Sequence, residues 1–118
     1  MSSAVATDPK TIVEQYFAFM RSADLGVLDL FREDAVIRGL GFRKHGREEI
    51  ADFYAGIIAG ARPSPSPAGP LLCDGERVVA EIDIELADGT TVHALDVFVV
   101  RDGRICSLTY FTADYPAG

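Results

Sequence analysis

The stretch from residue 90 to residue 112 constrains this chain more than any other. It contains two long runs of β-branched and aromatic residues joined at Arg101-Asp102-Gly103, and this pattern predicts a β-hairpin. An acidic residue, Asp96, stands in the middle of the more apolar run. Burying an ionised carboxylate without a partner is costly and drives the group to keep its proton. We therefore expect Asp96 to lie near any functional site, although a structural hydrogen-bond network would also explain it.

The length and charge of the chain restrict its class. Its 118 residues can form one domain with a hydrophobic core and are too few for two ordinary domains. We expect a single domain over residues 1–118, with an ordered core from about residue 9 to residue 113. The net charge is −7 and the Lys and Arg residues are scattered, which argues against a nucleic-acid partner because phosphate binding needs a basic face.

Several further classes of protein are not supported. No apolar run approaches the roughly 20 residues that span a bilayer, so we expect no membrane partner. Residues 1–8 contain neither the basic nor the apolar segment of an export signal, and we expect a cytoplasmic protein. Cys73 and Cys106 lie far apart without a CxxC motif, so we expect buried free thiols, no metal site and no cofactor.

The first half of the chain shows helical periodicity. Asp8 and Pro9 are typical of a helix start, and residues 25–31 suggest a short second helix. A third helix is predicted after Gly46, where Glu48 and Glu49 occupy the first turn. The apolar positions at helical spacing are Ile12, Val13, Tyr16, Phe17, Phe19 and Met20 in the first helix, and Ile50, Phe53, Tyr54, Ile57 and Ile58 in the third.

The second half reads as strands. Residues 34–40 form an early strand, residues 42–46 a connection, and the proline-rich residues 63–70 a loop that is neither helix nor central strand. Strands are then predicted over residues 71–73, 77–86, 90–101 and 104–112. Helices followed by an antiparallel meander define an α+β fold.

The position of Glu81 and Asp83 depends on the hairpin around Asp88-Gly89. A two-residue loop places Glu81 opposite Asp96 on one face, whereas a three-residue loop places Ala80 there and turns Glu81 and Asp83 toward solvent. We favour the three-residue loop, because neighbouring buried carboxylates repel.

The same reasoning applies to the last hairpin. A three-residue loop at 101–103 brings Leu108 opposite Asp96 and Tyr110 opposite Ala94, so that Tyr110 shares the face of Asp96. His93 alternates away from Asp96 and should lie on the outer face.

Two motifs carry a resemblance to a known superfamily. They are residues 45–50, HGREEI, and Asp96-Val97-Phe98 followed by Asp102-Gly103-Arg104-Ile105. In this element order the chain resembles the nuclear transport factor 2-like superfamily, which includes SnoaL-like polyketide cyclases, limonene epoxide hydrolase and ketosteroid isomerase. The resemblance implies a cone-shaped α+β barrel with three N-terminal helices packed on a curved, mostly antiparallel sheet. It also implies a pocket for a small apolar molecule and a homodimer formed through the outer sheet face.

Within the superfamily the chain looks most like ketosteroid isomerase. Tyr16 matches the oxyanion-binding tyrosine, Tyr54 a second tyrosine bonded to it, and Asp96 the protonated acid, so Tyr16 and Asp96 are the implied catalytic residues. The general base of that family falls at Gly39, where none is present. The expected ligand-binding residues are Tyr54, Tyr110, Leu108, Phe53 and Arg38.

These features leave two functions open. One is an isomerase or cyclase that acts on an apolar carbonyl compound by acid catalysis without metal or cofactor. The other is a non-catalytic ligand-binding or dimerisation module of the same fold. The match to limonene epoxide hydrolase is poorer, because Glu81-Ile82-Asp83 replaces the Arg-x-Asp of that family and Tyr110 replaces its last Asp.

Overall fold

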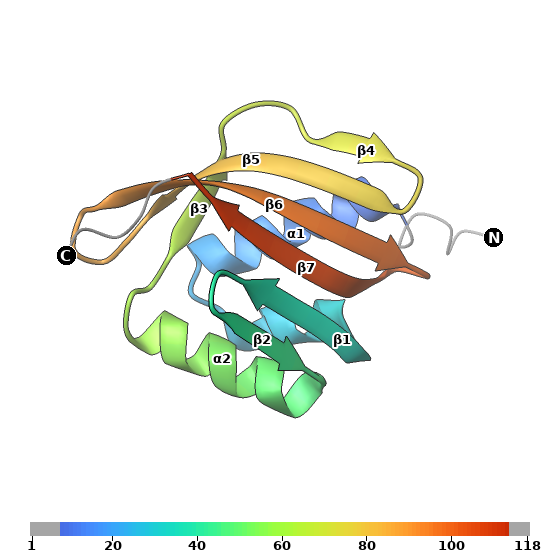
Figure 1. The fold of residues 1–118 in the computed structure, drawn as a ribbon, viewed down its shortest axis with the longest axis horizontal. Coiled ribbons are helices and arrows are strands. Elements are labelled where there is room, and N and C mark those ends of the chain that lie inside the picture. The colour runs from blue at the N-terminus through green and yellow to red at the C-terminus, as the bar shows by residue number, and fades with distance from the viewer. Residues whose placement is uncertain (1–7, 114–118) are drawn as a thin grey trace.

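The computed structural model describes residues 8–113, and it is an α+β structure as expected. Two α-helices and one 3-10 helix pack on one curved sheet (Figure 1). The helices are α1 (Pro9–Arg21), η2 (Leu25–Leu30) and α2 (Arg47–Ala59). The strands are β1 (Phe31–Gly39), β2 (Phe42–His45), β3 (Ser64–Pro67), β4 (Leu72–Asp74), β5 (Arg77–Glu85), β6 (Thr91–Arg101) and β7 (Arg104–Thr112).

The sheet is mostly antiparallel. Its strand order is β2-β1-β7-β6-β5-β3, with β4 also paired to β5, and β1 runs parallel to β7. In Figure 1 the strands β5, β6 and β7 curve over α1, while α2 lies beside β1 and β2. The concave face of this sheet and the helices therefore enclose the core.

Local sequence explains where the helices begin. The Asp8 side chain accepts a hydrogen bond from the Lys10 N–H at 3.3 Å, and Pro9 occupies the first helical position of α1. Before α2, Gly46 has φ +89, and the Glu49 side chain accepts a hydrogen bond from the His45 N–H at 2.8 Å. The buried residues of α1 are Ile12, Val13, Tyr16, Phe17 and Met20, which is the predicted stripe without Phe19.

Two predicted loops are strands. Residues 42–45 form β2, which pairs with β1 because Gly41, at φ +84, allows a tight reversal. Residues 64–67 form β3 at the edge of β5, although two of its four residues are proline. Proline lacks the N–H that a central strand needs and is tolerated at a sheet edge.

The register between β5 and β6 is the one favoured from the sequence. Ala80 lies opposite Asp96, and Glu81 lies opposite Leu95. On β5 the side chains of Val78, Ala80 and Ile82 face the core and are fully buried. Glu81 and Asp83 are exposed on the outer face. The arrangement avoids three neighbouring buried carboxylates.

The register between β6 and β7 differs from the prediction. Asp96 lies opposite Tyr110, not Leu108, which pairs with Phe98. The turn has a two-residue loop, Asp102-Gly103, with both residues at positive φ. Cys106 is then an extra residue on β7, between the pairs at 105 and 107. Each deviation moves the register by one residue in the same direction, so Tyr110 still shares the face of Asp96.

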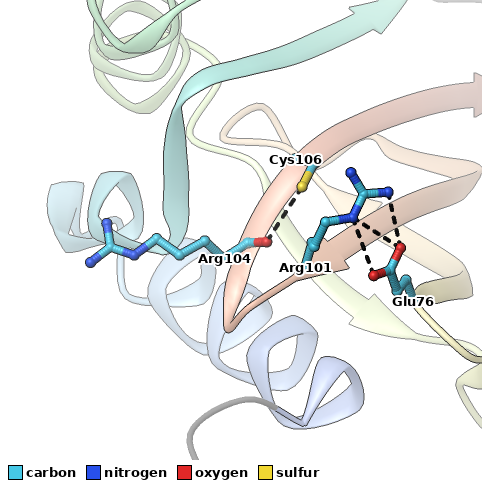
Figure 2. A network of polar contacts seen from close by, with 4 residues as sticks. All are labelled: Glu76, Arg101, Arg104 and Cys106. Carbon is cyan, nitrogen blue, oxygen red and sulfur yellow. Dashed lines mark hydrogen bonds and ion pairs between the residues drawn. The ribbon is translucent and has the colours of Figure 1, made fainter.

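Figure 2 shows the polar contacts at this end of the sheet. Arg101 donates two hydrogen bonds to the Glu76 carboxylate from Nε and one from Nη2, at 3.0 to 3.2 Å, while the Arg104 side chain points away from that pair. The contact ties the β4–β5 turn to the end of β6. The expectation of buried thiols is wrong, since Cys73 is exposed and Cys106 is half-buried, and both are free.

Candidate functional site

A cavity of about 450 Å³ lies between the helices and the concave face of the sheet. Its walls are almost entirely apolar, with side chains from both α-helices and from β1, β2, β3, β5, β6 and β7. The side chains with polar atoms among the described residues that line it are Tyr16, Asp96, Tyr110 and Thr112. A largely apolar pocket with a few convergent polar groups is typical of a small-molecule site.

Three tyrosine hydroxyls meet at the inner end of the cavity. The Tyr16 hydroxyl lies 2.8 Å from the Tyr54 hydroxyl and 2.9 Å from the Tyr110 hydroxyl, while Tyr54 and Tyr110 are 3.3 Å apart. Tyr16 comes from α1, Tyr54 from α2 and Tyr110 from β7. Either hydroxyl of each pair can be the donor, so the Tyr16 O–H is available to a ligand when Tyr54 and Tyr110 both donate to the Tyr16 oxygen.

Asp96 lies in the same cavity and lacks a partner. Its side chain is 1% exposed, and its Oδ1 has no hydrogen-bond partner among residues 8–113. Burial raises the pKa of the Asp96 carboxyl well above its usual value. In its protonated form, which burial favours, the carboxyl can donate one hydrogen bond and accept another.

Burial also raises the pKa of the Tyr16, Tyr54 and Tyr110 hydroxyls, and the nearby Asp96 carboxyl raises them further. The raised pKa values favour the protonated form of all four groups. The cavity therefore presents hydrogen-bond donors without a fixed charge, which suits a neutral acceptor such as a carbonyl oxygen.

The structure brings some predicted site residues together and separates others. Phe53 lines the cavity beside Tyr16, Asp96 and Tyr110. Tyr54 is fully buried behind Tyr16 and reaches the site through its hydroxyl. Leu108 is fully buried in the core and is absent from the cavity wall, and Arg38 lies on the outer face, where its Nε donates to the Thr109 hydroxyl at 3.4 Å.

Sequence reasoning missed Phe42, because residues 42–46 were expected to be a connection. Its ring stacks on Phe53 at 5.1 Å and lines the cavity beside Gly39. A Cβ at Gly39 would lie 2.6 Å from Phe42 Cε1, so the Phe42 ring fills the place of a side chain at residue 39. The alternation of Phe42 with Arg43 and Lys44 was the available signal for a strand.

His93 lies on the outer face as predicted. Its ring nitrogens are each 2.7 Å from a carboxylate oxygen, of Glu81 and of Asp83. The hydrogen bonds to Asp83 and Glu81 raise the pKa of His93. Glu81 and Asp83, which stand in place of the Arg and Asp of the epoxide hydrolase motif, are therefore outside the cavity, whereas Tyr110, in place of its last Asp, lines the cavity. Within residues 8–113 no cluster of His, Cys, Asp and Glu could hold a metal ion.

This cone of helices and curved sheet around an apolar cavity is the nuclear transport factor 2-like fold. The chain belongs to the SnoaL-like domain family, whose model matches residues 13–108. Among curated protein sequences, none matches this chain. No helix in the described part of the chain is long and apolar enough to cross a membrane.

Solved structures share the fold at low sequence identity. A presumed polyketide cyclase from Sinorhizobium meliloti is 24% identical over 85% of this chain and 93% of its own, with a TM-score of 0.77. A presumed ketosteroid isomerase from Kribbella flavida is 18% identical over 93% and 81%, with a TM-score of 0.79. An epoxide hydrolase of M. tuberculosis that resembles limonene epoxide hydrolase is 22% identical over 88% and 81%, with a TM-score of 0.78.

Proposed function

We propose that this protein binds a small apolar molecule with a carbonyl group and acts on it as an isomerase or cyclase by acid catalysis from Tyr16 and Asp96. The observation that carries the proposal is the unpartnered Asp96 Oδ1 in an apolar cavity. A buried polar atom without a partner is uncommon and needs an explanation. A bound ligand supplies the partner.

The tyrosine cluster explains how the acid site works. When the hydroxyls of Tyr54 and Tyr110, which lie 2.8 and 2.9 Å from the Tyr16 hydroxyl, both donate to it, the Tyr16 proton is directed at the ligand carbonyl. The neutral Asp96 carboxyl donates a second hydrogen bond to the same oxygen. Both bonds strengthen as negative charge develops on that oxygen during enolisation, in which water accepts the carbon-bound proton, and this difference lowers the barrier.

A second candidate function is non-catalytic binding, and Gly39 favours it. Enolisation needs a group that removes a proton from carbon, and the base position of ketosteroid isomerase falls at Gly39, against the Phe42 ring. Apart from Asp96, the described residues that line the cavity include no carboxylate and no histidine. On this alternative the site binds its ligand by the same two hydrogen bonds and does not transform it.

Ligand binding tests both candidates. We expect an apolar aryl ketone to bind about tenfold more tightly than the hydrocarbon of the same shape, since one well-placed hydrogen bond contributes about 1 kcal/mol or more. The measurement is displacement of a fluorescent apolar probe. Asp96→Asn should keep most of the preference because its amide also donates, whereas Asp96→Leu should reduce it to what the Tyr16 hydrogen bond alone contributes. Equal affinity for the ketone and the hydrocarbon in the unmodified protein would contradict the proposal.

We also propose a homodimer through the outer sheet face. Leu95 and Phe111 are cross-strand partners there and are 38% and 56% exposed. Half-buried Val79, Val97 and Val99 continue the same face. Exposed apolar area of this kind marks an interaction surface.

Sedimentation at micromolar concentration should show a dimer. Leu95→Lys should shift it to monomer, because a desolvated ammonium without a partner is costly at an interface. Arg43→Lys, on the exposed strand β2, is the control. A monomeric unmodified protein would rule out the dimer.

A further inference from the structure

A second hollow of about 240 Å³ adjoins the mouth of the cavity. Met20, Pro63 and Leu86 line both spaces, so the two are neighbours. The hollow adds two arginines, Arg21 at the end of α1 and Arg62 after α2. In a chain of net charge −7 this pair shares the hollow with a single carboxylate, that of Glu85.

The direction of α1 relates this hollow to the acid site. Tyr16 lies at the inner end of the cavity, Met20 lines it one turn later, and Arg21 ends the helix. The helical rise from Tyr16 to Arg21 is about 8 Å. The Arg21 Nη1 donates to the carbonyl of Pro65 at 3.3 Å, and Pro65 itself lines the cavity, so the guanidinium lies beside the opening.

The charges of the hollow favour an anion modestly. Within residues 8–113 neither Arg21 nor Arg62 forms an ion pair. Arg62 has φ +47, a conformation that is easier for glycine, and its N–H donates to the Ile57 carbonyl at 2.7 Å. Glu85 also lines the hollow, and the carbonyl end of α1 is partly negative, so the net excess is about one positive charge.

We propose that this hollow is a subsite for the carboxylate of an amphipathic ligand. The inference rests on the proposed function and narrows its ligand class: an apolar carbonyl acid, with the ketone at Tyr16 and Asp96 and the carboxylate at Arg62 and Arg21. The rise along α1, about 8 Å between the backbones of Tyr16 and Arg21, sets the scale of the span between the two groups. The planar guanidinium matches a carboxylate, because its N–H groups can donate to both oxygens.

A matched pair of ligands tests the subsite. The probes are a medium-chain keto acid, with the ketone at the end opposite the carboxylate, and its methyl ester. Both are titrated against bound N-phenyl-naphthylamine in low-salt buffer. We expect Arg62→Gln to weaken binding of the acid by roughly two- to fivefold and to leave binding of the ester unchanged. The effect is small because exposed ion pairs are weak. Glu85→Gln should strengthen binding of the acid by a similar factor, and added salt should reduce the effects of both substitutions.

Arg43→Gln is the control, because it removes the same charge from exposed strand β2, away from the hollow. Equal weakening by Arg62→Gln and Arg43→Gln would show a general charge effect and overturn the subsite. The subsite would also be overturned if the ratio of acid affinity to ester affinity were the same in the unmodified protein and in Arg62→Gln. In that case, binding of the ester in the cavity would leave the proposed function intact. If neither compound displaces the dye, the proposed function fails and the subsite fails with it.

Discussion

At pH 8 the Asp96→Asn variant is expected to be more stable than the unmodified protein by several kcal/mol. The Asp96 carboxyl is 1% exposed, its Oδ1 lacks a partner, and burial raises its pKa well above the usual value. In the unfolded chain the same carboxyl ionises near its reference pKa of about 3.9. Asparagine has nearly the same shape and no charge. Ionisation at residue 96 therefore favours the unfolded state of the unmodified protein and not that of Asp96→Asn.

The sign of the pH dependence follows from the raised folded-state pKa. The stability that the protonated Asp96 contributes is fully present below about pH 3.9 and is lost as pH rises from that value to the folded-state pKa. Within this window the unmodified protein should lose about 1.4 kcal/mol per pH unit relative to Asp96→Asn. Near pH 4 the free energies of unfolding of the unmodified protein and of Asp96→Asn should agree to within about 1 kcal/mol, the contribution of one changed hydrogen bond.

Urea unfolding of both proteins from pH 4 to pH 8 measures this difference. Asp52→Asn is the control, because Asp52 is exposed on α2 and its replacement should leave the profile unchanged. A difference between unmodified protein and Asp96→Asn that stays constant with pH would show that Asp96 is ionised in the fold. The neutral-donor role proposed for the carboxyl would then be wrong.

The sequence was sufficient where burial decided the answer. Placing Glu81 and Asp83 beside Asp96 would have buried three like charges, and the structure avoids this, with Ala80 opposite Asp96. The fold class and the buried stripe of α1 follow from similarly strong preferences, because each depends on a pattern that repeats over many residues.

The sequence was insufficient where one residue decided the answer. The bulge at Cys106 and the two-residue turn at Asp102-Gly103 each shift the register between β6 and β7 by one residue. Because two such shifts return Tyr110 to the same face of the sheet, the predicted face of Tyr110 is correct. Arg38 alternates to the outer face, opposite Arg43 on β2, a strand that the sequence did not reveal. Edge strands such as β2 and β3 are held by pairing with a neighbour, and their own residues carry little signal.

Restoring a base at residue 39 should convert the acid site into an isomerase, provided that the Phe42 ring is removed. The added Cβ would lie 2.6 Å from Phe42 Cε1, so Gly39→Asp alone would have to displace a ring that stacks on Phe53. The double variant Gly39→Asp with Phe42→Ala opens this space. Gly39 lines the same cavity as Tyr16 and Asp96, so the new carboxylate would face a ligand held there.

General base catalysis typically contributes about 10²- to 10⁴-fold, and we expect the double variant to isomerise a β,γ-unsaturated ketosteroid faster than Phe42→Ala alone by a factor in that range. The conjugated enone product is followed by its ultraviolet absorbance. Gly39→Asn with Phe42→Ala is the matched control, since it has the same shape and cannot accept the proton. If the Asp and Asn variants are equally inactive while circular dichroism shows intact folds, then Tyr16 and Asp96 do not stabilise an enolate, and the non-catalytic binding module is the function that remains.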